Sequence, residues 1–256
     1  MYILKSLVIA FSIYSAIPVW QFPWEEKDMK YMLCFFPWVG AAVGICFYLW
    51  NVLCQRLAVG NLCRTMVGAA IPLVVTGGFH VDGFMDTMDA LRSYGTKEKK
   101  LEILKDSHIG AFAVIMLAVY GLLYLGAYSE VGSVGLLRVL SGGFFLSRCL
   151  SGISVVSFPT AKKEGMLYHF ADSSQKSIVK WSLYLQGVCC IGFMLWQSLG
   201  AAAVAGAALV CFFYYYWRSK KEFGGITGDT VGFFVLVCEG SMMLMAAVME
   251  IIGRLG

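Results

Sequence analysis

The sequence predicts an all-α protein that crosses a membrane several times, folded as a single integral membrane domain over residues 1–256. Of these 256 residues, 59% are hydrophobic and only 14% are charged, and the mean hydropathy is +0.72. Ordinary soluble domains carry about 25% charged residues. The apolar residues also gather in long runs, and a helix of about 20 apolar residues spans a bilayer. These observations exclude a soluble domain, and the net charge of +4 gives no indication of nucleic-acid binding.

Eight apolar runs are candidate spans: 3–20, 31–53, 66–79, 109–128, 134–158, 181–199, 201–217 and 231–252. The first has Lys5 as its only cation and continues to Pro18 without a clear cleavage site, so we expect a retained helix. The run 66–79 is short, which fits either a re-entrant segment or one half of a longer helix. The turn at Gly200 is also tight. We therefore expect about eight transmembrane helices, although seven or nine also fit.

The distribution of cations predicts the orientation. If all eight runs cross, one side holds most of the Lys and Arg residues in the loops 21–30, 80–108, 159–180 and 218–230. The other side carries only Lys5, Arg56, Arg64, Arg138 and Arg254. Positively charged loops stay in the cytoplasm. We therefore predict a multi-pass protein of the cell inner membrane whose active-site loops, near 80–108, 159–180 and 218–230, face the cytoplasm and whose termini both face outward.

The segment from Gly77 to Asp89 has the sequence GGFHVDGFMDTMD, and it gives the strongest indication of chemical function in the chain. Asp82, Asp86 and Asp89 are spaced i, i+4 and i+7, which places them on one face of a helix. Three carboxylates on one face repel each other, so a positive partner is needed. Mg²⁺ takes oxygen ligands and commonly bridges carboxylates to substrate phosphates. The pattern predicts a metal site, with His80 as a further ligand, a phosphate contact or a polar cap.

Two basic segments are candidates for anion binding. Residues 105–110 read KDSHIG and precede the fourth run. A cation, a carboxylate and a hydroxyl at a membrane boundary suit phosphate and metal binding, although Asp106 or Ser107 could instead cap the helix. Residues 159–165 read PTAKKEG. Lys162 could contact lipid headgroups or bind an anion at the site.

Residues 224–230 read GGITGDT and enter the last apolar run. A glycine-rich turn at a helix N-terminus binds anions through free N–H groups, although Asp229 could serve only as an N-cap. Glu239 follows inside the run, and Arg148 lies inside the fifth run. A charge within a membrane segment is a functional-site hypothesis by default. These two charges could also simply pair in the interior.

Together these segments predict metal-assisted phosphoryl transfer, with Mg²⁺ as the cofactor. The predicted catalytic residues, which are also the predicted metal ligands, are Asp82, Asp86, Asp89 and Asp229. The predicted substrate-binding residues are His80, Lys105, Asp106, Ser107, His108, Arg148, Lys162, Thr227 and Glu239. Walker A, kinase, nucleophile-elbow and HExxH patterns are absent from the sequence. A bound diphosphate conjugate, without a separate ATP site, would therefore supply the phosphate.

The segment from Thr76 to Asp89 resembles the signature of the cobalamin synthase (adenosylcobinamide-GDP ribazoletransferase) family. The resemblance covers nearly the whole chain: Ile17–Val19, Phe36–Gly40, Lys105–Gly110, Pro159–Gly165 and Gly224–Asp229 are similar to further motifs of that family. Two positions depart from its pattern. His108 stands where the family usually has Arg, and Lys162 stands where Arg is common.

The resemblance implies an integral membrane enzyme of late cobamide assembly in a bacterium or archaeon. Its partners would be adenosylcobinamide-GDP, α-ribazole or its 5′-phosphate, and the lipid bilayer. The ribose 3′-hydroxyl would attack the phosphorus bonded to the cobinamide arm, and GMP would leave. The sequence does not fix whether the chain forms a homo-oligomer, how many metal ions it holds or which lower base it prefers.

Two other functions are alternatives to cobalamin synthesis. A CDP-alcohol phosphotransferase also uses an Asp cluster beside a membrane helix, but its Ala-Arg pair is missing, and Thr87-Met88 follows the second Asp here. A secondary transporter would use charges such as Arg148 and Glu239 at the membrane midplane. Its internal repeat is not visible, and the carboxylates gather near one membrane face instead.

Overall fold

The structure, a computed structural model, describes residues 2–20, 22–106, 108–162 and 165–255. In chain order its elements are α1 (Tyr2–Tyr14), the 3-10 helix η1 (Glu26–Cys34), α2 (Phe36–Arg56), α3 (Asn61–Thr76), α4 (Phe79–Arg92), α5 (Lys97–Ile103), α6 (Ala111–Glu130), α7 (Val134–Ser157), α8 (Met166–Ser173), α9 (Lys176–Gln197), α10 (Ala201–Phe223) and α11 (Gly228–Leu255).

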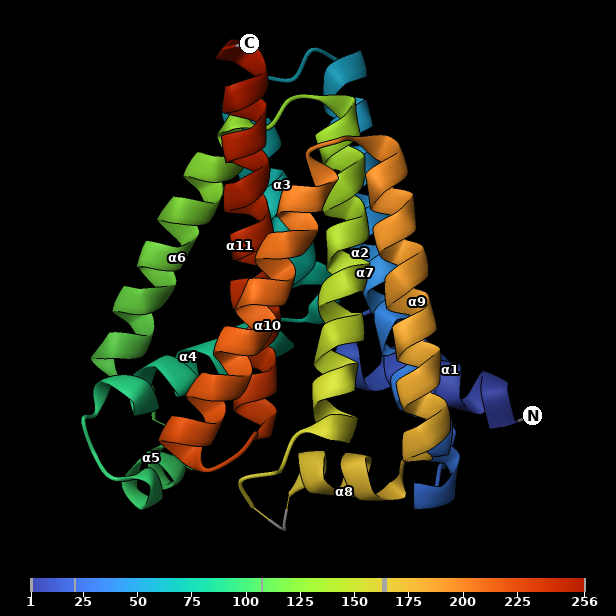
Figure 1. The fold of residues 1–256 in the computed structure, drawn as a ribbon, viewed down its shortest axis with the longest axis vertical. Helices are drawn as coiled ribbons and strands as arrows, with labels where there is room; N and C mark the ends of the chain where they lie inside the picture. Colours follow the sequence, from blue (N-terminus) through green and yellow to red (C-terminus); the bar gives the residue numbers. More distant parts are fainter. Residues whose placement is uncertain (1, 21, 107, 163–164, 256) are drawn as a thin grey trace.

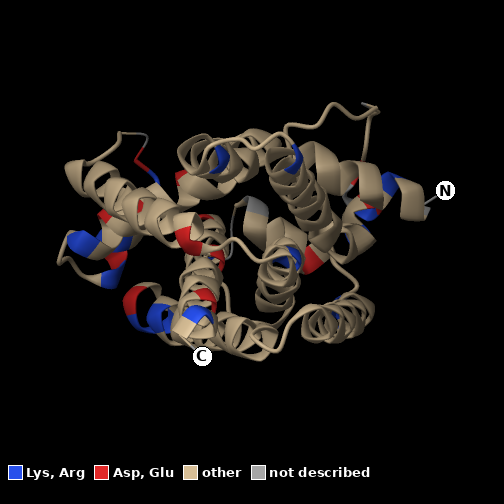
Figure 2. Cartoon of the chain, turned by 90° about the horizontal axis from the view of Figure 1, so that it is seen from above, with Lys and Arg blue, Asp and Glu red and all other residues tan. Residues whose placement is uncertain are grey.

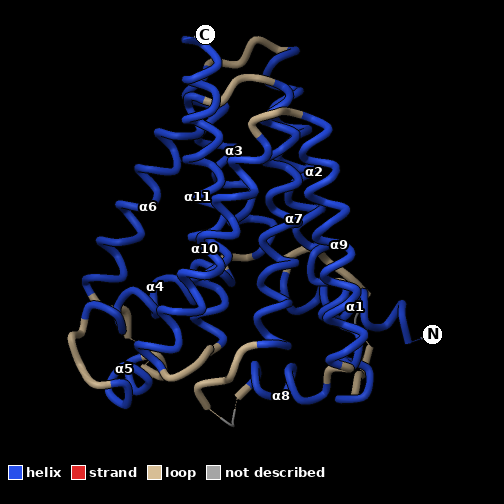
Figure 3. Tube along the Cα trace, viewed as in Figure 1, coloured by secondary structure: helices blue, strands red, loops and turns tan. Residues whose placement is uncertain are grey.

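The long helices form a bundle whose two ends differ. Helices α2, α3, α6, α7, α9, α10 and α11 run lengthwise, while α4, α5 and α8 gather at one end, called here the loop end (Figure 1). The described residues are helical nearly throughout (Figure 3), and their only β-interaction is an isolated bridge between Thr160 and Ile226. The prediction of an all-α fold is confirmed.

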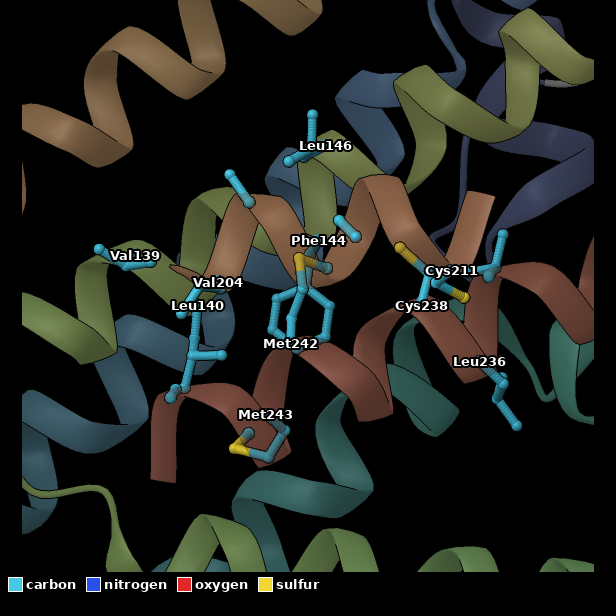
Figure 4. Packing of buried hydrophobic residues seen from close by; sticks show 14 of the residues in the cluster. Val139, Leu140, Phe144, Leu146, Val204, Cys211, Leu236, Cys238, Met242 and Met243 are labelled. Atoms are coloured by element: carbon cyan, nitrogen blue, oxygen red, sulfur yellow. The ribbon is translucent and has the colours of Figure 1, made fainter. Parts of the chain in front are cut away.

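Helix α7 forms the centre of the bundle. Most of its residues are buried, and it packs against α2, α9, α10 and α11. Phe144 of α7 meets Met242 of α11 in the core, and Leu140 lies beside Val204 of α10 (Figure 4). The sequence of α7 is rich in Gly and Ser, and such small residues let the backbones of membrane helices approach each other closely. This composition therefore suits α7 to the interior of the bundle.

The chain is a polytopic membrane protein, but the expected number of about eight spans is not reached. In the described part, five helices are long and apolar enough to cross a membrane, and a sixth span results if α3 and α4 count as one broken span. The apolar run 3–20 contains only the 13-residue helix α1, since the chain leaves the helix after Tyr14. Helix α10 ends in a charged segment and is not among the five.

The run 66–79 belongs to α3, which starts earlier, at Asn61, and ends where two glycines adopt left-handed conformations. Gly77 has φ of 62° and Gly78 has φ of 79°, and the Gly78 N–H donates to the Leu73 carbonyl over 3.0 Å. Such a paired glycine cap ends a helix without strain. Helix α4 then leaves at 95° to α3. Because of this bend, α4 lies across the loop end and outside the lengthwise segments.

The expectation that both termini lie on the same side is wrong. The C-terminus lies at the end opposite the loop end, whereas the N-terminus lies nearer the loop end (Figure 1). Helix α1 is held there by η1, since Lys5 forms an ion pair with Asp28 at 3.2 Å. Charged residues gather on a few segments and leave most of the helical surface uncharged (Figure 2). Lys5 therefore joins the cations of the loop end.

Candidate active site

Helix α4 presents the three carboxylates that the spacing predicts, at the loop end. Asp82 is exposed, and Asp86 and Asp89 are half-buried. Among the described residues, none of the three forms an ion pair with Lys or Arg. Burial, followed by repulsion from Asp82, Asp229 and Asp89, raises the pKa of Asp86 from 3.8 to about 6. The ionised carboxylates therefore repel one another, and a bound cation would relieve this repulsion.

The first residues of α11 bring Asp229 to this cluster. A Cβ on Gly83 would lie 2.7 Å from the Asp229 carbonyl oxygen, so a glycine is needed for α4 and α11 to come this close. Gly232 of α11 gives the same close approach on the other side, where its Cβ position lies 3.2 Å from the His80 carbonyl oxygen. These contacts bring together carboxylates from two distant segments, as the sequence predicts.

The segment 105–110 borders the same cluster. A Cβ on Gly110 would overlap both carboxylate oxygens of Asp89, so this glycine leaves the space that Asp89 occupies. Nearby, the His108 backbone N–H donates to Asp106 Oδ1 over 3.0 Å, and His108 Nδ1 lies 2.6 Å from the same oxygen. These hydrogen bonds lower the pKa of Asp106, with the larger effect from the side chain. Ser107 lies outside the described residues.

Two loops that the sequence places far apart are joined by backbone hydrogen bonds. The Ala161 N–H donates to the Ile226 carbonyl, and the Ile226 N–H donates to the Pro159 carbonyl, each over 2.9 Å. Lys162 Nζ donates to the Leu101 carbonyl over 3.0 Å, which ties this pair of loops to α5. Hydrogen bonds therefore join the two loops to each other and to α5.

Thr227, and not Asp229, caps α11. The Thr230 N–H donates to Thr227 Oγ1 over 3.2 Å, and the Thr227 N–H donates to Thr230 Oγ1 over 2.8 Å. A hydroxyl at this position satisfies an N–H group that the first turn leaves without a partner. The alternative that Asp229 serves only as a cap is therefore wrong, and its carboxylate remains available. Thr227 has a structural role whether or not it also contacts a ligand.

A cavity of about 400 Å³ lies between these segments. Its charged and polar lining includes Lys105, Lys162, Thr227 and Asp229, and it is called here the cation cavity. Asp229 interacts electrostatically with both Lys162 and Asp82. Because Asp229 lines the cavity and Asp82 belongs to the carboxylate cluster, the cavity adjoins that cluster. Cations beside grouped carboxylates can hold a phosphate on one side and a metal ion on the other.

Arg148 and Glu239 lie in the interior and pair with each other. Arg148 is 1% exposed and Glu239 is 6% exposed. Arg148 also donates to the Phe144 carbonyl over 3.1 Å, and the Ser147 hydroxyl donates to Glu239 over 3.2 Å. The structure therefore shows the interior pair that the sequence left open as an alternative. Neither residue lines the cation cavity, and their pairing removes the argument for a midplane transport site.

His80 is buried at the start of α4, apart from the cation cavity. It is 2% exposed, its ring meets the rings of Phe36 and Phe79 edge-on, and neither ring nitrogen has a hydrogen-bond partner among the described residues.

Sequence reasoning also missed Thr160 and Tyr168, which line the cation cavity. Tyr168 lies on α8, a short helix that carries no motif, so no sequence signal pointed to it.

The carboxylates suit Mg²⁺, although they form no complete metal site by themselves. Within the ranges that the structure describes, no group of three or more His, Cys, Asp or Glu side chains could hold a metal ion. Mg²⁺ usually takes only one or two carboxylates and completes its shell with waters and substrate phosphates. The hard oxygen donors of α4 and their mutual repulsion fit this mode of binding.

Comparisons with known proteins identify relatives along nearly the whole chain. The family model of cobalamin-5-phosphate synthase matches residues 6–247. An adenosylcobinamide-GDP ribazoletransferase of Lachnoclostridium phytofermentans is 41% identical over 252 residues, covering 98% of this chain and 95% of its own. Proteins of the same name from Clostridium botulinum Eklund 17B and Clostridium perfringens SM101 are 32% and 29% identical, covering 92% and 95% of this chain and 94% and 98% of their own. No solved structure is significantly similar to the chain.

Proposed function

Because the chain belongs to the cobalamin-5-phosphate synthase family, we propose that it is an adenosylcobinamide-GDP ribazoletransferase. It joins adenosylcobinamide-GDP to α-ribazole or its 5′-phosphate. The acceptor 3′-oxygen forms a bond to the phosphorus that carries the cobinamide arm. The bond from that phosphorus to the bridging oxygen breaks, and GMP leaves with the electron pair. The hydroxyl proton passes to a base or to water, and the product is adenosylcobalamin or its 5′-phosphate.

The observation that carries this proposal is the meeting of carboxylates and cations at the loop end. Asp82, Asp86 and Asp229 lie within electrostatic reach of one another, and Asp229 and Lys162 line the same cavity. A diphosphate needs cations along its length and a metal ion to neutralise the charge that develops on the leaving group. The lysines, and the carboxylates that would hold the metal ion, lie at this one place.

We propose that Asp82, Asp86, Asp89 and Asp229 supply the ligands for Mg²⁺. When bound, the ion neutralises the phosphate oxygens and fixes their position. Lys105 and Lys162, which line the cation cavity together with Asp229, bind the diphosphate. Asp106 and His108, which are both exposed, extend this polar surface toward solvent. Arg148, Glu239 and His80 would act from the interior, by holding α4, α7 and α11 in position.

The site would face the cytoplasm of a cell whose inner membrane holds the bundle. The support is the distribution of cations. The far end of the described bundle carries Arg56, Arg64, Arg138 and Arg254, while the loop end carries most of the remaining Lys and Arg residues. The positive-inside rule assigns such an end to the cytoplasm. Adenosylcobinamide-GDP and GMP are soluble nucleotides, which agrees with this side.

Release of GMP from adenosylcobinamide-GDP by the purified protein in detergent tests the function. We expect GMP only when α-ribazole and Mg²⁺ are both present, and almost none from Asp82→Asn. Asp172→Asn is the matched control, since Asp172 is an exposed carboxylate on α8 outside the cluster. Near wild-type turnover of Asp82→Asn at saturating Mg²⁺ would refute the metal assignment. Absence of GMP release from the wild-type protein would refute the activity.

A further inference from the structure

A second cavity lies at the loop end, and its lining is aromatic and aliphatic rather than charged. It has a volume of about 610 Å³ and is called here the aromatic cavity. Its walls include Trp24, Met29, Phe79, His169 and Phe170, which come from the segment before η1, from η1, from α4 and from α8. Sites for small molecules have this size and this largely apolar lining.

The aromatic walls are held in place by their own packing. The ring of Tyr14 meets the ring of Phe79 edge-on at 5.6 Å and the ring of Phe170 edge-on at 6.3 Å. Phe170 is buried at 6% exposure, whereas Trp24 is 42% exposed at the rim. Two walls are therefore fixed before a ligand arrives, and the indole of Trp24 offers an accessible ring. Such a site recognises a flat, apolar ring by stacking.

The aromatic cavity adjoins the cation cavity. Gly165 lines both of them, in a left-handed conformation with φ of 91°. Phe79 also begins the helix that carries Asp82 one turn later. A molecule that fills the aromatic cavity and passes Gly165 therefore enters the cavity that Lys105, Lys162 and Asp229 line.

We propose that the aromatic cavity binds the heterocyclic base of the acceptor nucleoside, with the ribose extending past Gly165 toward the cation cavity. This inference rests on the proposed function, because it assigns a place to the acceptor of that reaction. The base of α-ribazole is a bicyclic benzimidazole with two apolar faces and few hydrogen-bonding atoms. The cavity supplies rings for the faces and leaves the reacting 3′-hydroxyl near the carboxylates.

The guanine of the donor fits this cavity poorly. Its edge carries several hydrogen-bond donors and acceptors, and burying them without partners costs free energy. Among the described residues that line the aromatic cavity, His169 and the indole N–H of Trp24 supply the polar side-chain groups, and the other side chains are aromatic or aliphatic. A lining that is mostly aromatic and aliphatic therefore favours an apolar bicyclic ring over a purine nucleotide.

Equilibrium binding of α-ribazole to the full chain in detergent, measured by calorimetry without donor, tests the inference. We expect Trp24→Ala to raise the dissociation constant by about tenfold, since loss of one stacking ring weakens base binding by that order. Trp24→Phe keeps a ring and should bind nearly as the wild type does. The matched control is Trp20→Ala, because Trp20 lies in the same segment, is 82% exposed and does not line the cavity.

Kinetics supply the second readout. In GMP release, Trp24→Ala and Phe79→Leu should raise KM for α-ribazole and leave KM for adenosylcobinamide-GDP unchanged. Unchanged binding of α-ribazole in both variants would overturn the inference, even if GMP release is normal. If Trp24→Ala and Phe79→Leu weaken the binding of GMP and not that of α-ribazole, the cavity binds guanine, and this result would overturn the inference as well. Wild-type protein that binds α-ribazole in this way but releases no GMP would refute the proposed reaction and not the cavity.

Discussion

The Asp86 carboxyl lies where burial and three neighbouring carboxylates all disfavour its ionised form. In an unfolded chain the same group ionises near 3.8 and in the folded chain near 6. Its protonated form therefore favours the folded state below about pH 3.8, and this contribution is lost as pH rises through about 6. At neutral pH the ionised cluster opposes folding unless a cation binds.

This linkage predicts how Mg²⁺ changes thermal stability. Without Mg²⁺, the wild-type unfolding midpoint should fall as pH rises from 5 to 7.5. Addition of Mg²⁺ should raise the midpoint by about 2–4 °C at pH 7.5 and by less at pH 5. Asp86→Asn should reduce both effects, because the asparagine stays neutral. Thermal unfolding in detergent measures this, and an equal Mg²⁺ effect in wild type and Asp86→Asn would contradict the prediction.

His108 supplies a second prediction for a single residue. Its side chain is 90% exposed and hydrogen-bonds Asp106, so it faces solvent beside the cluster. A guanidinium is always charged and binds phosphate oxygens in a fork, so His108→Arg should keep activity or raise it by about two- to threefold. His108→Ala should lower it. GMP release measures both variants, and an unchanged rate in His108→Ala would limit His108 to a structural role.

Close contact between α4 and α11 brings the carboxylates together. This contact depends on Gly83, whose Cβ position lies 2.7 Å from the backbone of Asp229. Gly83→Ala would push the two helices apart. We expect at least tenfold lower GMP release and a lower unfolding midpoint, since overpacking costs about 1–3 kcal/mol. Gly126→Ala on α6 is the control, because no atom lies within 4 Å of its Cβ position. Full activity of Gly83→Ala would show that the contact can relax.

The sequence predicts a helix well where a single physical property, such as the length of an apolar run, determines it. Long apolar runs predict α6, α7 and α11, and the i, i+4, i+7 spacing places three carboxylates on one helix face. The first run misleads because composition alone does not show that the helix ends at Tyr14. The 95° bend also escapes prediction, since glycines can end a helix in several directions and tertiary packing selects one.

The sequence predicts the charged residues of the candidate site, but it does not predict the apolar residues that line it. Motifs identify Asp229 and Lys162, because a carboxylate or a cation near a membrane needs a partner. Trp24 and Phe170 carry no such signal, since aromatic residues are common in any membrane protein. Arg148 and Glu239 look functional in the sequence, but only their packing shows that each is the other's partner.

At the scale of the whole molecule, the C-terminus lies at the end opposite the loop end, and the N-terminus lies at the side of the bundle, nearer the loop end (Figure 1). If the loop end faces the cytoplasm, a single cysteine at position 97 or near the N-terminus should react only from the cytoplasmic side. A cysteine at position 254 should react only from outside. Impermeant thiol reagents measure this on a background without native cysteines. Labelling of position 97 from outside would reverse the orientation.

The crosswise course of α4 decides how a reactant meets the enzyme. Since this helix turns by 95° from α3 and exposes Asp82, we predict that its carboxylates open toward water and not toward acyl chains. The reactants would then reach the enzyme from the aqueous phase, so the rate of turnover should depend on their concentration in solution. The same amount of enzyme can be reconstituted into a larger total area of vesicle membrane. This dilution slows an enzyme whose reactants are dissolved in the lipid, but it should leave the rate of this enzyme unchanged.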